Sequence, residues 1–162
     1  MITDHRQSDD HARCPNLEAE TITHRNRKSH STQDQSQRQR LFLGSSTPEF
    51  DIEHSHGMHV VHDGPRQAPP LLLIHGSGAS GGFWSPMVPV LAAHHHLIRV
   101  DLPGCGQSPP APSYDVPAQA GQVAALLDDL GLRHVAVAGH SRGGYVATAL
   151  AEQRPDLVGS LA

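Results

Sequence analysis

Residues 133–144 read RHVAVAGHSRGG and join a predicted buried strand to a predicted helix. The apolar alternation stops at Gly139, and residues 145–151 (YVATALA) then follow a helical pattern. Between them, Ser141 is flanked two residues to either side by Gly139 and Gly143. So sharp a turn holds a serine in strained backbone angles, and the glycines remove side chains that would collide with it. Strand, G-x-S-x-G and helix together predict a nucleophile elbow with Ser141 as the exposed nucleophile.

Two earlier strands are each followed by an unusual loop. Residues 71–74 (LLLI) form a continuous apolar run, typical of a parallel strand covered on both faces, and end in HGSGASGG at residues 75–82. Residues 97–101 (LIRVD) predict the next strand, which is followed by LPGCGQS at residues 102–108. Residues 116–130 then keep the apolar spacing of an amphipathic helix. This alternation predicts an α/β fold with a parallel sheet and helices on both faces, hence three layers.

The chain divides into a polar tail and a domain. Residues 1–47 are rich in Asp, Arg, His, Gln and Ser and almost free of large apolar groups. Such a segment cannot bury enough surface to offset the entropy of ordering it, so we predict a disordered tail. The domain, residues 48–162, begins with two short strands at 50–54 and 58–62 that resemble an edge hairpin.

Composition argues against several classes of partner. The net charge of −4 gives no reason to expect nucleic acid, and the mixed charges of the tail disfavour a nucleic-acid-binding arm. No apolar run approaches membrane-spanning length, and the N-terminus lacks the apolar stretch of a signal peptide. The two cysteines, Cys14 and Cys105, have no C-x-x-C spacing. We therefore predict a cytoplasmic protein with neither a nucleic-acid nor a membrane partner.

Fourteen histidines raise the question of a metal site. The run at residues 94–96 is consecutive, so its three side chains cannot all face one ion from regular structure. The group in residues 54–62 lacks a cysteine or carboxylate to complete a ligand set. We predict surface histidines, no metal and no other cofactor.

Three motifs in this order resemble the α/β-hydrolase fold family: HGSG at 75–78, DLPGCGQS at 101–108 and GHSRG at 139–143. The resemblance covers roughly residues 50–162. It implies a three-layer, mostly parallel sheet in which the strand at 134–138 lies beside that at 71–74.

The resemblance also implies a chemistry, hydrolysis of an ester or related acyl bond in a small-molecule substrate, without a cofactor. Ser141 would attack the acyl carbon, and two backbone N–H groups would stabilise the oxyanion. One donor would be Arg142, directly after the nucleophile, and the other Ser77, with Gly78 as the alternative. The haloalkane-type mechanism is disfavoured, because serine stands where that mechanism has aspartate. The positions of the motifs that would have structural roles are His75, Gly76, Gly78, Asp101, Gly104, Gly106, Gly139 and Gly143.

In this family the triad acid and histidine follow the nucleophile. No histidine follows His140, and Asp156 precedes the place where a sixth strand is expected. The resemblance therefore implies an N-terminal portion of the fold, truncated after the helix of the elbow and inactive as this chain. The alternative is a non-catalytic fragment or interaction module of hydrolase ancestry.

Three finer expectations concern the neighbourhood of the elbow. The side chain of His140 should pack away from the serine, and that of Arg142 should reach solvent. With no sixth strand, the far edge of residues 135–138 should be unpaired, which predicts self-association through an exposed sheet edge.

Overall fold

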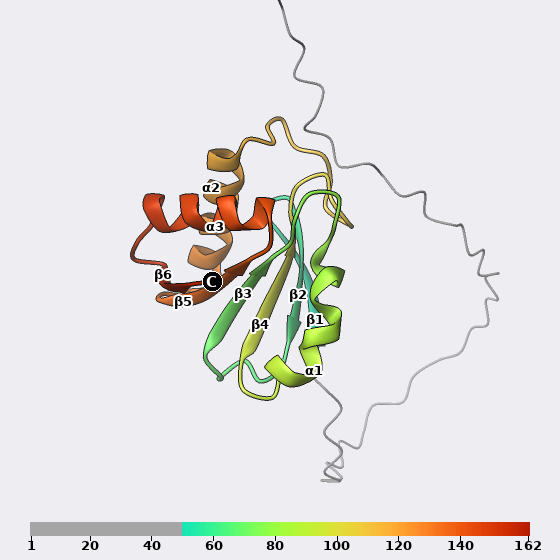
Figure 1. Cartoon of the computed structure of the whole chain (residues 1–162), viewed down its shortest axis with the longest axis vertical. Coiled ribbons are helices and arrows are strands. Elements are labelled where there is room, and N and C mark those ends of the chain that lie inside the picture. Colours follow the sequence, from blue (N-terminus) through green and yellow to red (C-terminus); the bar gives the residue numbers. More distant parts are fainter. Residues whose placement is uncertain (1–49) are drawn as a thin grey trace, which may run out of the picture. The chain divides into compact units, whose positions relative to one another are not determined.

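A computed structural model describes residues 50–162, which form one six-stranded sheet with helices on both of its faces (Figure 1). The predicted polar tail lies outside the described residues. The strand order is β1-β2-β4-β3-β5-β6. The strands are β1 (Phe50–Ser55), β2 (Met58–Asp63), β3 (Pro70–Ile74), β4 (His96–Asp101), β5 (Val135–Gly139) and β6 (Val158–Leu161). The helices are η1 (Gly81–Met87), α1 (Val88–Leu91), α2 (Val116–Asp129) and α3 (Arg142–Gln153).

The sheet is mostly parallel. Strands β1 and β2 form the predicted antiparallel hairpin, and β2 pairs antiparallel with β4. From β4 onward the pairs β4–β3, β3–β5 and β5–β6 are all parallel. The predicted neighbourhood of residues 71–74 and 134–138 is confirmed, with Leu72 opposite Val137. The fold class predicted from the motifs is therefore confirmed.

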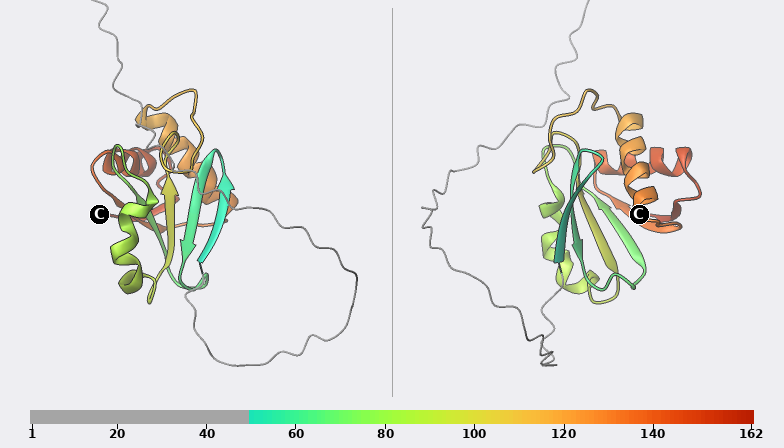
Figure 2. Two further views of the ribbon diagram at one scale, coloured as in Figure 1. Left: turned by 90° about the vertical axis from the view of Figure 1, so that its right-hand side faces the viewer. Right: turned by 180° about the vertical axis from the view of Figure 1, so that it is seen from behind.

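Successive side chains along the inner strands point to opposite faces of the sheet, so they contribute to two separate hydrophobic cores. Leu72 and Ile74 point to the face covered by α2 and α3, where they join the larger cluster of buried apolar residues. Leu73 points to the opposite face and packs with Leu97 and Trp84 of η1. Figure 2 shows the sheet between these two groups of helices. Because β3 is buried on both faces, its continuous apolar run is the pattern that its position requires.

Helix α2 follows the local signals of its sequence closely. The carboxylate of Asp115 accepts a hydrogen bond from the N–H of Ala118 at 2.7 Å and caps the N-terminus. The predicted apolar positions Ala120, Val123 and Leu127 are all buried. The helix ends before Gly131, whose φ of 66° allows the chain to turn back toward β5.

The predicted unpaired edge on residues 135–138 is wrong, because β6 covers it. Val135 lies opposite Val158 and Val137 opposite Leu161. The N–H of Ala162 donates to the carbonyl of Val137 at 2.9 Å, which continues this pairing to the last residue. Residues 154–157 join α3 to β6, and Leu157, the last of them, is fully buried. The outer edge of the described sheet therefore belongs to β6, and self-association through that edge stays a prediction.

Within residues 50–162, no helix is both long enough and apolar enough to cross a membrane.

Candidate active site

Ser141 stands between β5 and α3 in a backbone conformation rare for a residue with a side chain, with φ 53° and ψ −117°. Such a conformation costs about 1–3 kcal/mol and persists only where the surroundings impose it. Here the N–H of His140 donates to the carbonyl of Ile74 at 3.0 Å, and the N–H of Gly143 donates to the carbonyl of His140 at 2.9 Å. The residue is exposed, and its hydroxyl makes no hydrogen bond that caps α3.

Two glycines of this turn are fixed by close backbone approach. A Cβ on Gly139 would lie 2.5 Å from the carbonyl oxygen of Gly143. A Cβ on Gly143 would lie 2.3 Å from the carbonyl oxygen of Ile74 at the end of β3. The neighbouring Gly144 differs, since its nearest atom would be 3.5 Å away, an ordinary contact. The serine turn is therefore in close contact with β3 at Gly143, whereas Gly144 leaves room for a side chain.

The loop after β3 lies directly against the serine. A Cβ on Gly76 would be 3.2 Å from the Cβ of Ser141 and 2.9 Å from Nδ1 of His140. His75, which begins the loop, is fully buried. Its Nδ1 donates to the carbonyl of Gly76 at 2.7 Å, and its Nε2 accepts from the N–H of Leu102 at 3.0 Å. Burial lowers the pKa of His75, so the ring stays neutral with both nitrogens occupied.

Asp101 organises the loop after β4. Its Oδ1 accepts the N–H of Gly81 at 2.6 Å and its Oδ2 accepts the N–H of Gln107 at 2.8 Å. Gly106 has a φ of 54°, and a Cβ there would be 2.1 Å from Oδ2 of Asp101. The carboxylate is therefore used in joining this loop and the start of η1 to the end of β4.

The side chain of Arg142 was expected to reach solvent, and this expectation is wrong. Its Nη2 donates to the carbonyl of Tyr114, and its Nε donates to Oε1 of Gln119 at 3.4 Å. Tyr114 in turn lies against Gly104, where a Cβ would be 2.8 Å from the tyrosine ring. Arg142 thus connects the serine turn with the loop between β4 and α2.

His140 is exposed and stacks on a neighbouring aromatic ring. Its ring centroid lies 4.6 Å from that of Phe83, with 26° between the planes. Phe83 is itself 47% exposed on η1, so the two rings form a surface beside the serine turn.

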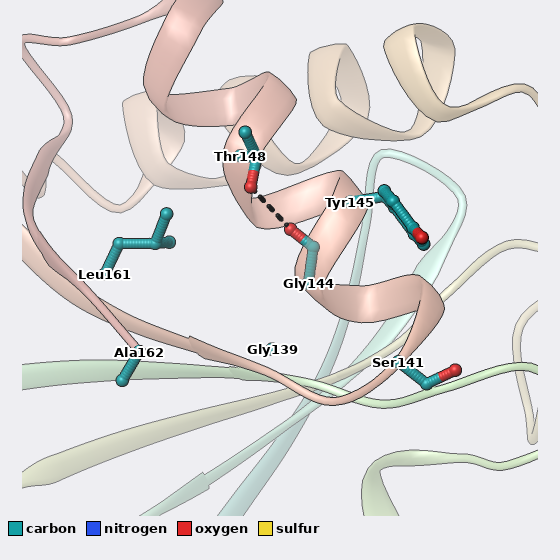
Figure 3. Close-up of a pocket in the computed structure, with 7 residues that line it drawn as sticks. All are labelled: Gly139, Ser141, Gly144, Tyr145, Thr148, Leu161 and Ala162. Carbon is teal, nitrogen blue, oxygen red and sulfur yellow. Dashed lines mark hydrogen bonds between the residues drawn. The ribbon is translucent and has the colours of Figure 1, made fainter.

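A hollow of about 420 Å³ lies between α3 and β6. Figure 3 shows Ser141 at its edge, with the hydroxyl pointing away from Leu161 and Ala162. The hollow therefore lies behind the hydroxyl. It is lined by Gly139, Ser141, Gly144, Tyr145, Thr148, Leu161 and Ala162.

This arrangement of strand, serine turn and helix can be compared with known proteins. A family model described as the alpha/beta hydrolase fold matches residues 69–162, more than half of the chain. The chain belongs to the alpha/beta hydrolase fold family. The resemblance read from the three motifs is therefore confirmed.

Individual members of the alpha/beta hydrolase fold family differ in their named roles. The chain is 39% identical over 98 residues to the magnesium-chelatase 30 kDa subunit of Rhodobacter capsulatus, covering 59% of this chain and 34% of that subunit. It is 41% identical over 97 residues to the pimeloyl-acyl-carrier-protein methyl ester esterase of Aeromonas hydrophila, covering 59% of this chain and 37% of that enzyme. Among solved structures, the epoxide hydrolase CorEH superposes with a TM-score of 0.65 at 34% identity, covering 71% of this chain and 41% of that one. The chain thus spans little more than a third of the length of these curated relatives.

Several histidines of this hydrolase-fold chain lie inside the structure, which corrects the prediction of surface histidines. His59, His62 and His96 are at most 4% exposed. Nδ1 of His62 lies 2.9 Å from Nε2 of His96, and the guanidinium of Arg66 donates to Nδ1 of His62 at 2.9 Å. Burial lowers the pKa of both rings, that of His96 to about 4, so neutral imidazoles can fill these positions. Among residues 50–162, no group of three or more His, Cys, Asp or Glu side chains is arranged to hold a metal ion.

Two features of the site gave no clear signal in the sequence. The contact of Arg142 with α2 depends on how α2 and α3 cross, and the stacking of Phe83 on His140 depends on where η1 lies. The only local indication of the contact between Arg142 and α2 was the presence of a large cationic residue directly after the serine. Both are long-range side-chain contacts, which local patterns do not encode.

Proposed function

We propose that this chain carries the nucleophile and the oxyanion site of a serine hydrolase that acts on an ester or a related acyl bond. The observation that carries this proposal is the conformation of Ser141, exposed and held at φ 53° at the start of α3. Backbone strain of this kind is concentrated at functional sites, and the hydroxyl of Ser141 is not used to cap the helix that follows it. The esterase among the relatives favours esters within this class.

The chemistry follows from the position of the serine. Its oxygen attacks the acyl carbon, a base takes the hydroxyl proton, and the leaving alcohol departs with a proton returned by that base. Water then cleaves the acyl-serine ester and regenerates the hydroxyl. The transient oxyanion would accept the N–H of Arg142, which as the first residue of α3 has no partner within the helix. The second donor would be the N–H of Ser77, or of Gly78, in the loop that lies against the serine. Each donor is expected to contribute about 3 kcal/mol to the transition state.

We further propose that the 162-residue chain by itself is a very slow catalyst. We expect neither histidine of the site to serve as the base. His75 has both ring nitrogens occupied by hydrogen bonds. His140 directly precedes the serine, and adjacent side chains at such a turn point apart; its ring lies on Phe83. The family resemblance implies that acid and base follow the nucleophile. Oxyanion stabilisation without a base leaves about a thousandfold rate enhancement over water in related serine enzymes.

A fluorophosphonate probe tests the proposal, because it reacts with activated serines and needs no known substrate. We expect slow, time-dependent labelling of the 162-residue chain that Ser141→Ala abolishes. Ser160→Ala, which changes an exposed serine on β6, is the matched control and should label like the wild type. Labelling that survives Ser141→Ala would refute the assignment of the nucleophile. Labelling as fast as that of an intact serine hydrolase would refute the proposal that the 162-residue chain lacks a catalytic base.

A second candidate is a non-catalytic module of hydrolase ancestry. It is favoured by one observation, the similarity to a protein named as a magnesium-chelatase subunit. Complete absence of Ser141-dependent labelling in a chain that is folded by circular dichroism would favour this candidate over the enzyme.

A further inference from the structure

The side chain of Arg142 begins beside the serine and ends on another helix. Its guanidinium donates to the carbonyl of Tyr114 and to Oε1 of Gln119, the second in the first turns of α2. Gln119 is only 3% exposed, so this amide is fixed by the packing of α2. The contact therefore ties the first residue of α3 to a rigid part of the structure.

The serine turn is held from two sides. On the β3 side, the backbone of Gly143 is pressed against the carbonyl of Ile74, and Gly76 lies against Ser141. On the α2 side, Arg142 makes its two hydrogen bonds. A strained turn keeps its conformation only where the surroundings over-determine it, so a tether on the second side matters.

We propose that Arg142 is a positioning residue whose side chain fixes the orientation of its own N–H and of the adjacent Ser141. This inference rests on the proposed function, in which that N–H stabilises the oxyanion. The residue thus has two parts with separate roles, a backbone donor at the reacting centre and a guanidinium that holds the donor in place.

The geometry of the contact requires arginine in particular. Two acceptors on different residues, Tyr114 and Gln119, are reached by two nitrogens of one planar group. Lysine carries the same charge on a single nitrogen and lacks this fork. The charge also faces Asp115, whose pKa is lowered by hydrogen bonds from Ser113 and Ala118 and, to a lesser extent, by Arg142. The guanidinium is therefore engaged with the start of α2.

The test compares labelling rates of Ser141 in the full 162-residue chain with the same fluorophosphonate probe. For Arg142→Ala we expect a fall of about tenfold, the factor associated with one charge-assisted hydrogen bond. Arg142→Lys should recover part of the loss, and methylguanidine at millimolar concentration should restore labelling of Arg142→Ala. Gln119→Met removes one acceptor without altering the turn, and should lower the rate by a smaller factor. Arg133→Ala is the matched control, since Arg133 is an exposed arginine paired with Asp128.

The possible outcomes separate this inference from the proposed function. If Ser141→Ala leaves the wild-type labelling unchanged, the proposed function fails. If labelling depends on Ser141 but Arg142→Ala stays within twofold of the wild type, the positioning role is refuted. The positioning role is also refuted if Arg142→Ala labels more slowly, melts at a lower temperature and is not rescued by methylguanidine. In that case Arg142 has only a structural role. Slower labelling with unchanged melting and rescue by methylguanidine would support the positioning role.

Discussion

Acidification should destabilise this domain through the buried pair His62 and His96. The pair lies between β2 and β4, with ring centroids 5.1 Å apart, and Arg66 donates to it from the following loop. Two carboxylates of β1 face the same group: Glu53 approaches Nε2 of His62 at 3.3 Å, and Asp51 pairs with Arg66 at 2.9 Å. Protonation of either ring is therefore opposed by burial, which disfavours the charged form, and by the positive charge of Arg66.

The sign follows from comparing the folded and unfolded chains. Unfolded, His96 takes up a proton near its ordinary pKa of 6.5, whereas burial, His62 and Arg66 lower its pKa to about 4 in the fold. Below pH 6.5 the unfolded state binds more protons, so stability falls as the pH falls, and the loss is complete near pH 4. For His96 this amounts to about 2 kcal/mol at pH 5 and about 3 kcal/mol at the lower limit. The pKa of His62 is lowered as well, mainly by burial, and acts in the same direction.

Urea unfolding at pH 7.5 and pH 5, followed by the fluorescence of the single, buried Trp84, measures the effect. We expect His96→Gln to remove about 2 kcal/mol of the pH dependence, because glutamine does not titrate. His94→Gln is the matched control, since His94 lies in the same run of histidines but is exposed. An unchanged pH dependence in His96→Gln would show that protonation of this pair does not govern acid stability.

Three further predictions concern the turn, a buried ion pair and the tail. Gly143→Ala should lower the melting temperature strongly, because its Cβ would lie 2.3 Å from a carbonyl oxygen, whereas Gly144→Ala should leave it nearly unchanged; equal effects would contradict the close approach. Asp63→Asn should cost about 3 kcal/mol in urea unfolding, because it leaves the guanidinium of Arg99, bound at 2.7 Å and 12% exposed, without its charge partner, and a loss below 1 kcal/mol would refute this. Limited trypsin digestion should cleave within residues 1–47 before the domain, and protection of that tail would contradict its predicted disorder.

Local chemistry made the fold predictable from the sequence. The continuous apolar run of β3, the capping carboxylate of Asp115 and the glycines around Ser141 can each be recognised within a few residues of sequence, although contacts such as that of Gly143 with Ile74 are long-range. The prediction of an unpaired edge at β5 was wrong because Val158–Leu161 already form β6 and pair with it, where the sequence indicated only the beginning of a sixth strand. The buried histidines were missed for another reason. His62 and His96 meet because β2 pairs with β4, and the two residues are 34 positions apart in the sequence, so no local pattern reveals the pair.

The candidate site also combines features that local sequence predicts with features that depend on distant residues. This difference determines how its function can be tested. The backbone features of the site are the strained serine and the nearby N–H groups. They are built from glycine-rich turns at the ends of β3 and β5, and such turns can be recognised in the sequence. The side-chain features of the site depend on partners from other elements, as the reach of Arg142 to α2 shows. A backbone oxyanion site cannot be deleted by mutating a side chain, whereas a tether such as Arg142 can. Replacing the tether while leaving Ser141 in place therefore measures how much of the serine's reactivity comes from the geometry of its turn.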